Sequence, residues 1–226
     1  MGLLRRVLNA MLAILLVAAS PAAAERIVAV GDLHGDHEAL LDIAAAAGVS
    51  DEQGRWTGGQ TVLVQLGDFA DRGPDSLKII RYLQGLEVAA PTGGGKVVIL
   101  VGNHEAMNVT GDLRYVHPGE YAAFATRNSA KFRDRVFDEN RKAVLAQYRQ
   151  TDAGMSLEHA RRRFVEETPL GMLEHRKVWK PSGDIGRWIS ARPAIVRIGD
   201  TLFAHGGISA EFAARSIEEI NAEISA

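Results

Sequence analysis

The segment Gly67-Asp68-Phe69-Ala70-Asp71-Arg72-Gly73 limits the possible folds of this chain more than any other. Residues 61–66 before it form a short apolar run with two valines, which is typical of a buried strand that ends at a glycine. Pro74 after it suits the first turn of a helix. We therefore expect Asp68 at the carboxyl end of a strand, the edge where open α/β sheets bind ligands. A plain charged turn would look the same in isolation, so the neighbouring segments decide.

Two further segments repeat this order of strand, glycine-flanked turn and helix. Residues 26–30 and 96–101 have the pattern of buried strands, and they lead into Gly31-Asp32-Leu33-His34-Gly35 and Gly102-Asn103-His104-Glu105. The first polar residues of the three turns follow one another at intervals of 36 and 35 residues, which suits successive β-α-β units. Helices are predicted at 37–47 and 74–87. The three turns should therefore meet at one edge of a parallel sheet in an α/β fold.

The polar residues in these turns are oxygen and nitrogen donors. Asp32 and His34 are two residues apart, so in an extended segment their side chains project from the same face. There they can together hold a divalent ion. Such a pair is common by chance, and only its repetition in three turns gives it weight. The chain has no cysteine, which excludes a thiolate nucleophile or a thiolate metal site.

Four ordered motifs carry a resemblance to a known family. The turns at 31–35, 67–73 and 102–105, together with His205-Gly206-Gly207, are similar to those of the phosphoprotein phosphatase family of metallophosphoesterases. The segment 102–108, followed by Leu113-Arg114-Tyr115-Val116, resembles more narrowly the bacterial Shewanella-like protein phosphatases. The resemblance covers roughly residues 26–209. It implies a layered α/β/β/α fold with a helical insertion.

The resemblance also implies a site with two divalent metal ions, manganese first, with iron or zinc as alternatives. Asp32 and His34 would hold the first ion, and Asn103 and His205 the second. Asp68 would bridge the two, because an anionic carboxylate suits a position between two cations. Two such ions a few ångströms apart activate water and stabilise both oxygens of an in-line displacement.

Three more residues receive roles from the same resemblance. Arg72 would bind phosphate oxygens, for which its planar guanidinium is suited. His104 would be the general acid that protonates the leaving group, and Asp71 would orient it. The resemblance thus implies a phosphatase that hydrolyses phosphomonoesters, with a phosphoprotein as the first choice of substrate, by metal-activated water.

The remaining sequence supplies the rest of a single domain, predicted from residue 25 to 226. Residues 111–180 are polar and helical in pattern, and are expected to form an insertion over the site. Residues 194–204 predict a β-hairpin with a Gly-Asp turn that leads to His205. After the His-Gly-Gly motif the family pattern has a further histidine ligand, whereas residues 210–226 contain none. We therefore expect the fold to be truncated there, as a fragment or a degenerate protein, with one ion bound tightly and the second weakly.

Residues 1–24 have the pattern of a signal peptide. Arg5 and Arg6 precede an apolar stretch from about residue 10 to 19, and small residues lead to a cleavage site before Glu25. The stretch is too short for a membrane span, so we expect export to the periplasm or medium and only transient membrane contact. Removing these residues, which carry two arginines and no acids, changes the net charge from −2 to −4. An acidic protein of this kind is not expected to bind nucleic acid.

Two alternatives stay open at this point. A dinucleoside polyphosphate hydrolase shares much of the Gly-Asp-x-His-Gly and Asp-Arg-Gly-Pro pattern, although the signal peptide and residues 113–116 count against it. A truncated, inactive binding module is the other. Assays of both substrate classes, with metal analysis, would separate the three.

Overall fold

The centre of the molecule is a parallel sheet of three strands. A computed structural model describes residues 26–225 and places β1 (Ile27–Val30), β2 (Val62–Gln65) and β3 (Lys96–Ile99) side by side in that order. Val64 in β2 pairs with Ala29 and Val98, so the three strands end at the same level. The parallel sheet expected from the three strand patterns is confirmed, and each strand lies within its predicted range.

Two helices cover one face of this sheet. Helix α2 (His37–Ala46) begins at Asp36, whose carboxylate accepts a hydrogen bond from the backbone N–H of Ala39 at 2.9 Å. Helix α3 (Ser76–Ala89) starts two residues later than predicted and is followed by the short 3-10 helix η1 (Ala90–Gly93). Their apolar faces form the main core together with the inner face of the sheet. Its most deeply buried members include Leu40, Leu63, Phe69, Ile79, Ile80, Leu83, Ile99 and Trp179.

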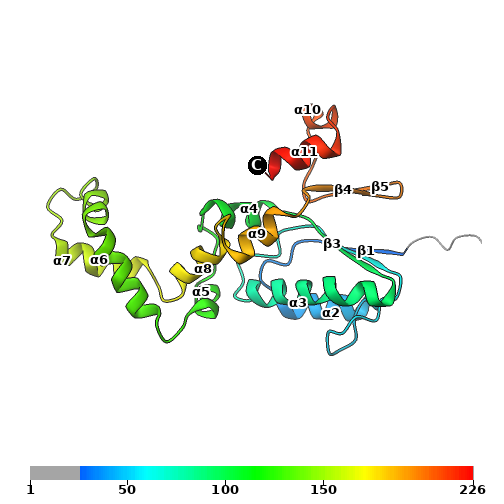
Figure 1. Cartoon of the computed structure of the whole chain (residues 1–226), viewed down its shortest axis with the longest axis horizontal. Coiled ribbons are helices and arrows are strands. Elements are labelled where there is room, and N and C mark those ends of the chain that lie inside the picture. The colour runs from blue at the N-terminus through cyan, green and yellow to red at the C-terminus, as the bar shows by residue number, and fades with distance from the viewer. Residues whose placement is uncertain (1–25, 226) are drawn as a thin grey trace, which may run out of the picture.

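The opposite face of the sheet packs against a hairpin. Strands β4 (Ile195–Ile198) and β5 (Thr201–Ala204) pair antiparallel across the predicted Gly-Asp turn. Alternate residues of β2 and β3 contact the hairpin in a second apolar cluster that includes Val64, Leu100, Val196 and Phe203. Helices α10 (Ala210–Ala213) and α11 (Ile217–Ile224) lie beyond the hairpin, where the Asn221 side chain bonds the backbone of Ile195 at 2.9 Å. Helices, sheet, hairpin and helices thus form four successive layers (Figure 1).

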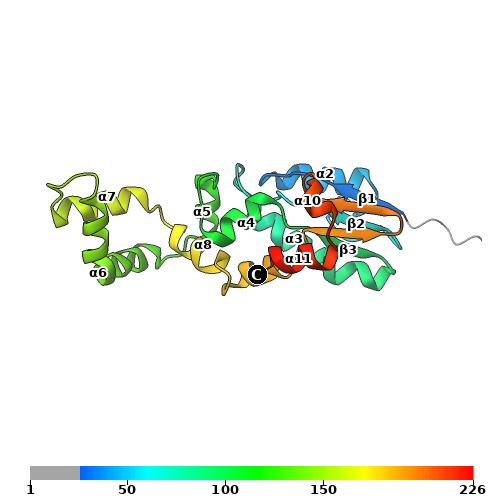
Figure 2. The ribbon, with the colours of Figure 1, turned by 90° about the horizontal axis from the view of Figure 1, so that it is seen from above.

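Between residues 103 and 190 every regular element is a helix. Three of them lie against the body: α4 (Asn103–Thr110), α8 (Met172–Trp179) and α9 (Asp184–Ser190). Helix α5 (Pro118–Phe124) joins them, and helices α6 (Ser129–Tyr148) and α7 (Leu157–Glu167) project from one end as an arm, seen in Figures 1 and 2. The helical segment continues ten residues beyond the predicted limit of 180, to Ser190.

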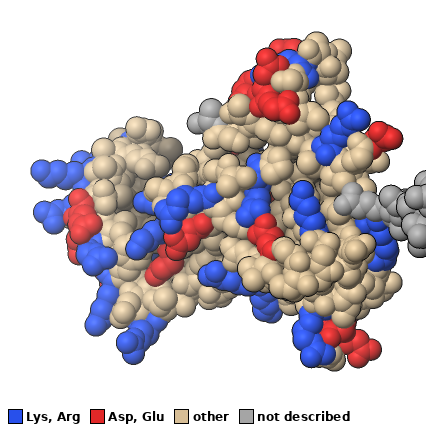
Figure 3. Space-filling view, turned by 45° about the vertical axis from the view of Figure 1, so that its right-hand side comes forward, with Lys and Arg blue, Asp and Glu red and all other residues tan. Residues whose placement is uncertain are grey.

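Charged side chains of both signs cover the arm. Figure 3 shows Lys and Arg side chains spread over this end of the molecule with acidic side chains among them. Arg161 pairs with Asp138, and Arg163 with Glu167 at 2.7 Å. Arg162, between them, pairs with Glu158. The three consecutive arginines 161–163 of α7 therefore belong to a solvated, ion-paired surface.

Within residues 26–225, none of the helices combines the length and apolar character that crossing a bilayer requires. The predicted signal peptide, residues 1–24, lies outside the described residues.

Candidate active site

The three predicted turns meet at the carboxyl ends of β1, β2 and β3. The backbone N–H groups of Leu33 and His34 donate to the carbonyl of Asp68 at 2.9 and 3.0 Å, which fixes the first turn on the second. The second and third turns touch at Gly67 and Gly102: a Cβ on Gly67 would lie 2.5 Å from the Gly102 nitrogen. A side chain at residue 67 would therefore force the two turns apart.

Four site residues adopt the left-handed backbone conformation that favours glycine. His34, Asp68, Asp71 and Arg72 have φ angles of 45°, 53°, 69° and 63°. They are the only non-glycine residues between 26 and 225 with positive φ. Such conformations cost about 1–3 kcal/mol each and persist where surrounding bonds determine them. One such bond runs from the backbone N–H of Arg72, which donates to the carbonyl oxygen of Tyr115 at 2.8 Å.

One group of potential metal ligands consists of Asp32, Asp68 and His205, whose donor atoms lie within 4.8 Å of one another. The Nδ1 atom of His205 lies 3.1 Å from the Leu66 carbonyl oxygen, which can only accept, so Nδ1 carries the ring proton. The lone pair on Nε2 then faces Asp68 Oδ2 at 3.3 Å and Asn103 Oδ1 at 3.1 Å. In the neutral imidazole, Nε2 of His205 and the oxygens of Asp68 and Asn103 direct lone pairs at one another, an arrangement that fits a cation.

A second group consists of His34, Asp68 and His104, again within 4.8 Å. The Nδ1 atom of His34 lies 3.3 Å from the Ala70 carbonyl oxygen, and Nε2 lies 3.5 Å from Asp32 Oδ2. His34 and His205 thus both direct Nδ1 at a backbone carbonyl and Nε2 at other candidate ligands, the usual orientation of a metal-binding imidazole. Hence all five residues predicted as ligands lie around one centre, and their chemistry fits divalent ions.

Asp68 is the shared member of the two groups. Its side chain is buried, and Oδ1 accepts the backbone N–H of His104 at 2.9 Å. Oδ2 lies 3.3 Å from Nε2 of His205 and 3.9 Å from Nε2 of His104. A buried carboxylate with one oxygen fixed by the backbone and the other facing two imidazoles suits a position between two cations.

Glu105 was not predicted as part of the site. It is fully buried and accepts backbone N–H groups from Asp68 at 2.8 Å, Ala70 at 3.0 Å and Gly102 at 3.0 Å. Burial raises the pKa of the Glu105 carboxyl to about 7, against the three hydrogen bonds, which favour the ionised form. The residue ties the second turn to the third. The sequence held a signal for this role of Glu105. It lies three residues after Gly102, at the start of α4, and a glutamate at that position bonds back to the backbone at the helix N-terminus.

His104 and Asp71 form a buried pair beside this centre. Nδ1 of His104 lies 2.8 Å from Asp71 Oδ2, and Asp71 Oδ1 accepts from the Asn108 amide at 2.8 Å. Nε2 of His104 lies 3.2 Å from the Arg72 guanidinium. Because arginine only donates, Nε2 is the acceptor of that bond and Nδ1–H donates to Asp71. Asp71 therefore holds the imidazole of His104 through Nδ1, and Nε2 faces Arg72.

Tyr115 completes the rim of the site. Its ring lies 5.1 Å from the His104 ring, edge to face, and the guanidinium carbons of Arg72 and Arg114 lie 5.9 and 5.8 Å from its centre. Tyr115 as a whole is 47% exposed. The sequence did not mark it as a functional residue.

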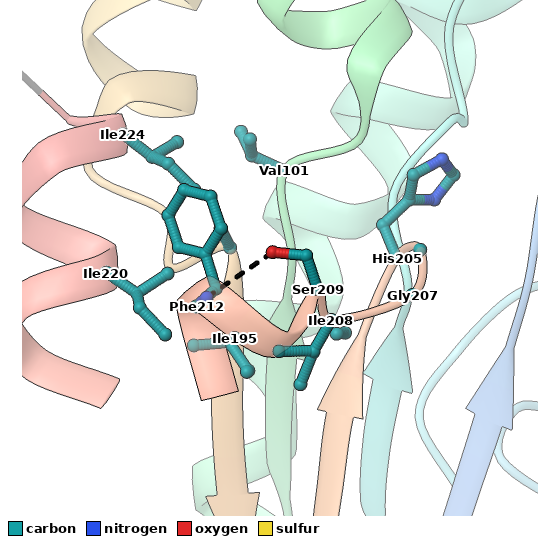
Figure 4. Close-up of a pocket in the computed structure, with 12 residues that line it drawn as sticks. Val101, Ile195, His205, Gly207, Ile208, Ser209, Phe212, Ile220 and Ile224 are labelled. Carbon is teal, nitrogen blue, oxygen red and sulfur yellow. Dashed lines mark hydrogen bonds between the residues drawn. The ribbon is translucent and has the colours of Figure 1, made fainter. Parts of the chain in front are cut away.

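An apolar pocket lies next to His205, between the hairpin and the last two helices. It has a volume of about 400 Å³, and Figure 4 shows Ile208, Phe212, Ile220 and Ile224 around it. His205 is one of the residues that line this pocket, and its ring points away from the apolar side chains (Figure 4).

Comparisons with known proteins show to which family the chain is similar. Residues 25–223 match the family described as calcineurin-like phosphoesterase. Shewanella-like protein phosphatase 2 of Arabidopsis thaliana is 35% identical over 203 residues, which cover 88% of this chain and 51% of that protein. Shewanella-like protein phosphatase 1 of Plasmodium berghei is 27% identical over 196 residues, 87% of this chain and 42% of that protein.

Among solved structures, the cold-active protein-tyrosine phosphatase of a psychrophilic Shewanella species has a similar fold. The TM-score is 0.60 with 26% sequence identity, over 89% of this chain and 48% of that one. The chain therefore spans about half the length of the relatives it matches.

Proposed function

The chain belongs to the calcineurin-like phosphoesterase family, and from that premise we propose that it hydrolyses phosphomonoesters of phosphoproteins with two divalent metal ions. The predicted kinship to Shewanella-like protein phosphatases is confirmed by two relatives of that name. The activity itself is our proposal, since the chain covers 51% of the length of one of these relatives and 42% of the other. The observation that carries it is the convergence of both ligand groups on Asp68, beside the pair of His104 and Asp71.

The proposed ligands divide into two sets that share Asp68. This division follows the family resemblance: Asp32 and His34, 3.5 Å apart, would complete the first set, and Asn103 and His205, 3.1 Å apart, the second. The two geometric groups divide differently, because they place Asp32 with His205 and His34 with His104. When bound, such ions lower the pKa of water and neutralise phosphate oxygens. We propose manganese as the metal, with iron and zinc as the alternatives that this set of oxygen and imidazole donors also accepts.

The side chains that are not proposed as metal ligands would bind the phosphate and transfer one proton. Arg72 is exposed, and we assign it to the phosphate oxygens, which its planar guanidinium fits. His104 would protonate the leaving oxygen from Nε2 in its doubly protonated form. The proton that Nε2 takes up replaces the hydrogen bond that this nitrogen accepts from Arg72 at 3.2 Å. Asp71 would hold the imidazole through Nδ1 and stabilise its charged form. A ligand role for His104 is the competing assignment, because its Nε2 also lies 3.9 Å from Asp68.

The choice of a phosphoprotein substrate rests on the relatives. Those of Arabidopsis and Plasmodium are named protein phosphatases, and the Shewanella enzyme is named a protein-tyrosine phosphatase. These names favour phosphoproteins over dinucleoside polyphosphates, and over an inactive binding module. Phosphotyrosine and phosphoserine peptides should therefore be compared directly, with a dinucleoside polyphosphate as the third substrate. Hydrolysis of the dinucleotide alone would overturn the proposal.

We also propose that the protein is exported, on the pattern of residues 1–24 alone. The test is cell fractionation of the full-length chain, with N-terminal sequencing of the mature form. A first residue at Glu25 in the periplasm or medium is expected. An uncleaved chain in the cytoplasm would contradict it.

The substitution Asp68→Asn tests the metal centre. It removes one negative charge between the two proposed cations and should abolish metal-dependent turnover and lower the metal content after dialysis. The matched control is Asp42→Asn on the exposed surface of α2, which should change neither. Full metal content and activity in Asp68→Asn would exclude its bridging role.

A further inference from the structure

We propose that Ser76, Glu120 and His175 form a buried chain of positioning residues that holds Asp71, and through it His104. The inference deepens the proposed function and rests on it in one respect, the assignment of His104 as the acid. The three residues come from α3, α5 and α8, so the helical segment would contribute two residues that support the site.

The chain of contacts is continuous. The backbone N–H of Asp71 donates to Ser76 Oγ at 3.1 Å, and the Ser76 hydroxyl donates to Glu120 Oε2 at 2.6 Å. Nε2 of His175 lies 3.1 Å from Glu120 Oε1. Asp71, Ser76, Glu120 and His175 are each 0% exposed. Water therefore does not compete for any of these bonds.

The first bond of the chain acts on a strained residue. Asp71 has a φ of 69°, which an aspartate keeps only when its neighbours hold it. A serine hydroxyl has one hydrogen, and here Glu120 takes it, so a lone pair of Oγ stays directed at the Asp71 N–H. At 2.6 Å the hydroxyl–carboxylate bond has the length of a strong, charge-assisted bond. Glu120 thus fixes the direction in which Ser76 holds Asp71.

His175 in turn holds Glu120. Its Nδ1 atom has no hydrogen-bond partner among residues 26–225, so the ring proton belongs on Nε2, where it is donated to Glu120. The rings of Tyr121, Phe124 and Trp179 surround the imidazole at 5.1 to 5.7 Å and exclude other orientations. A carboxylate and an imidazole are costly to bury where apolar side chains would pack as well. Their connection to Asp71 through Ser76 gives them a role in orienting the pair of Asp71 and His104, beyond packing.

The test compares Ser76→Ala with Ser129→Ala. Ser129 is equally buried, accepts the backbone N–H of Thr126 at 2.8 Å and donates to Glu174 at 2.5 Å, but it lies at the start of α6, away from the site. The two substitutions remove the same two kinds of bond. Glu120→Gln, which keeps one oxygen for the Ser76 hydroxyl, is the conservative variant and should be affected less than Ser76→Ala.

The first readout does not require activity. NMR of the ¹⁵N-labelled full chain in Mg²⁺ buffer, which is not paramagnetic, should show the Nδ1 proton of His104, identified by its loss in His104→Gln. Ser76→Ala should shift this signal or broaden it by exchange, and Ser129→Ala should leave it in place. An unchanged signal in Ser76→Ala would overturn the inference.

The second readout is kinetic. Ser76→Ala should lower kcat for a phosphoserine peptide by roughly 10- to 100-fold, the scale of a small misplacement of a catalytic group, with little change in KM. Equal losses in Ser76→Ala and Ser129→Ala would show a general structural effect and overturn the inference. If the wild-type chain has no phosphatase activity but the NMR signal responds to Ser76→Ala alone, the positioning chain stands and the proposed function fails.

Discussion

At the scale of single residues, His104 is the side chain whose role is most open to a direct test. A general acid matters most for a poor leaving group, with typical contributions of roughly 10²–10⁴ in rate. His104→Ala should therefore cost far more with phosphoserine peptides than with a nitrophenyl phosphate, whose phenolate leaves without a proton. Steady-state kinetics on both substrates would measure the difference.

The same variant separates the acid from a metal ligand. Loss of an acid should leave the metal content nearly unchanged, because the proposed ligand sets do not include His104. Equal rate losses on both substrates, together with loss of metal, would assign His104 to the second ligand group with His34 and Asp68.

The residues that could be predicted from sequence are those placed by the ends of strands. Asp32, Asp68 and Asn103 each follow a short apolar run, and parallel strands bring such positions to one edge. Glu120 and His175 could not be found this way. They lie 44 and 55 residues from the partners they bond, Ser76 and Glu120, and only the packing of α5 and α8 brings them together.

At the scale of elements, the contact between the second and third turns depends on glycine. Gly67 has a φ of 97°, and a Cβ there would lie 2.5 Å from the Gly102 nitrogen. Gly67→Ala should therefore destabilise the fold by more than about 1–3 kcal/mol, since it combines backbone strain with a steric clash. Chemical denaturation would measure the loss.

The opposite result is expected for Gly85→Ala in the middle of α3. An added Cβ there meets nothing within 4 Å, and alanine is the better helix former by about 1 kcal/mol. This variant should be slightly more stable than the wild type. If Gly67→Ala and Gly85→Ala lowered the free energy of unfolding to the same extent, the close contact between the second and third turns would not be the cause.

The elements differ in how well their limits could be predicted. The strands and α2 were placed within about two residues, because apolar periodicity and glycine mark their ends. The helices between 118 and 190 were expected only as one helical segment. Helices α6 and α7 are polar on average and bury few residues, so no continuous apolar run marks where each begins and ends, although α7 is amphipathic.

At the scale of the whole molecule, the arm of α6 and α7 has a small core of its own. Phe137 is 1% exposed and packs against Phe164 with ring centres 5.4 Å apart. Phe137→Ala should cost about 3–5 kcal/mol of local stability and open the arm while the sheet stays folded. Hydrogen exchange should accelerate for the amides of α6 and α7 but not for those of β1, β2 and β3.

Phe132→Ala, on the same helix but half-buried, is the matched control and should change exchange much less. If Phe137→Ala accelerates exchange equally in the arm and in the sheet, the two unfold as one cooperative unit.

The four left-handed residues have a consequence for how such a protein can evolve. An exposed residue such as Arg72 keeps its φ of 63° at a cost of roughly 1–2 kcal/mol that glycine would not incur. Arg72→Gly should therefore raise the melting temperature while phosphatase activity is lost, and a lower melting temperature would contradict this. Selection for heat resistance alone would thus erode this site first, so stability and activity compete at the same few backbone positions.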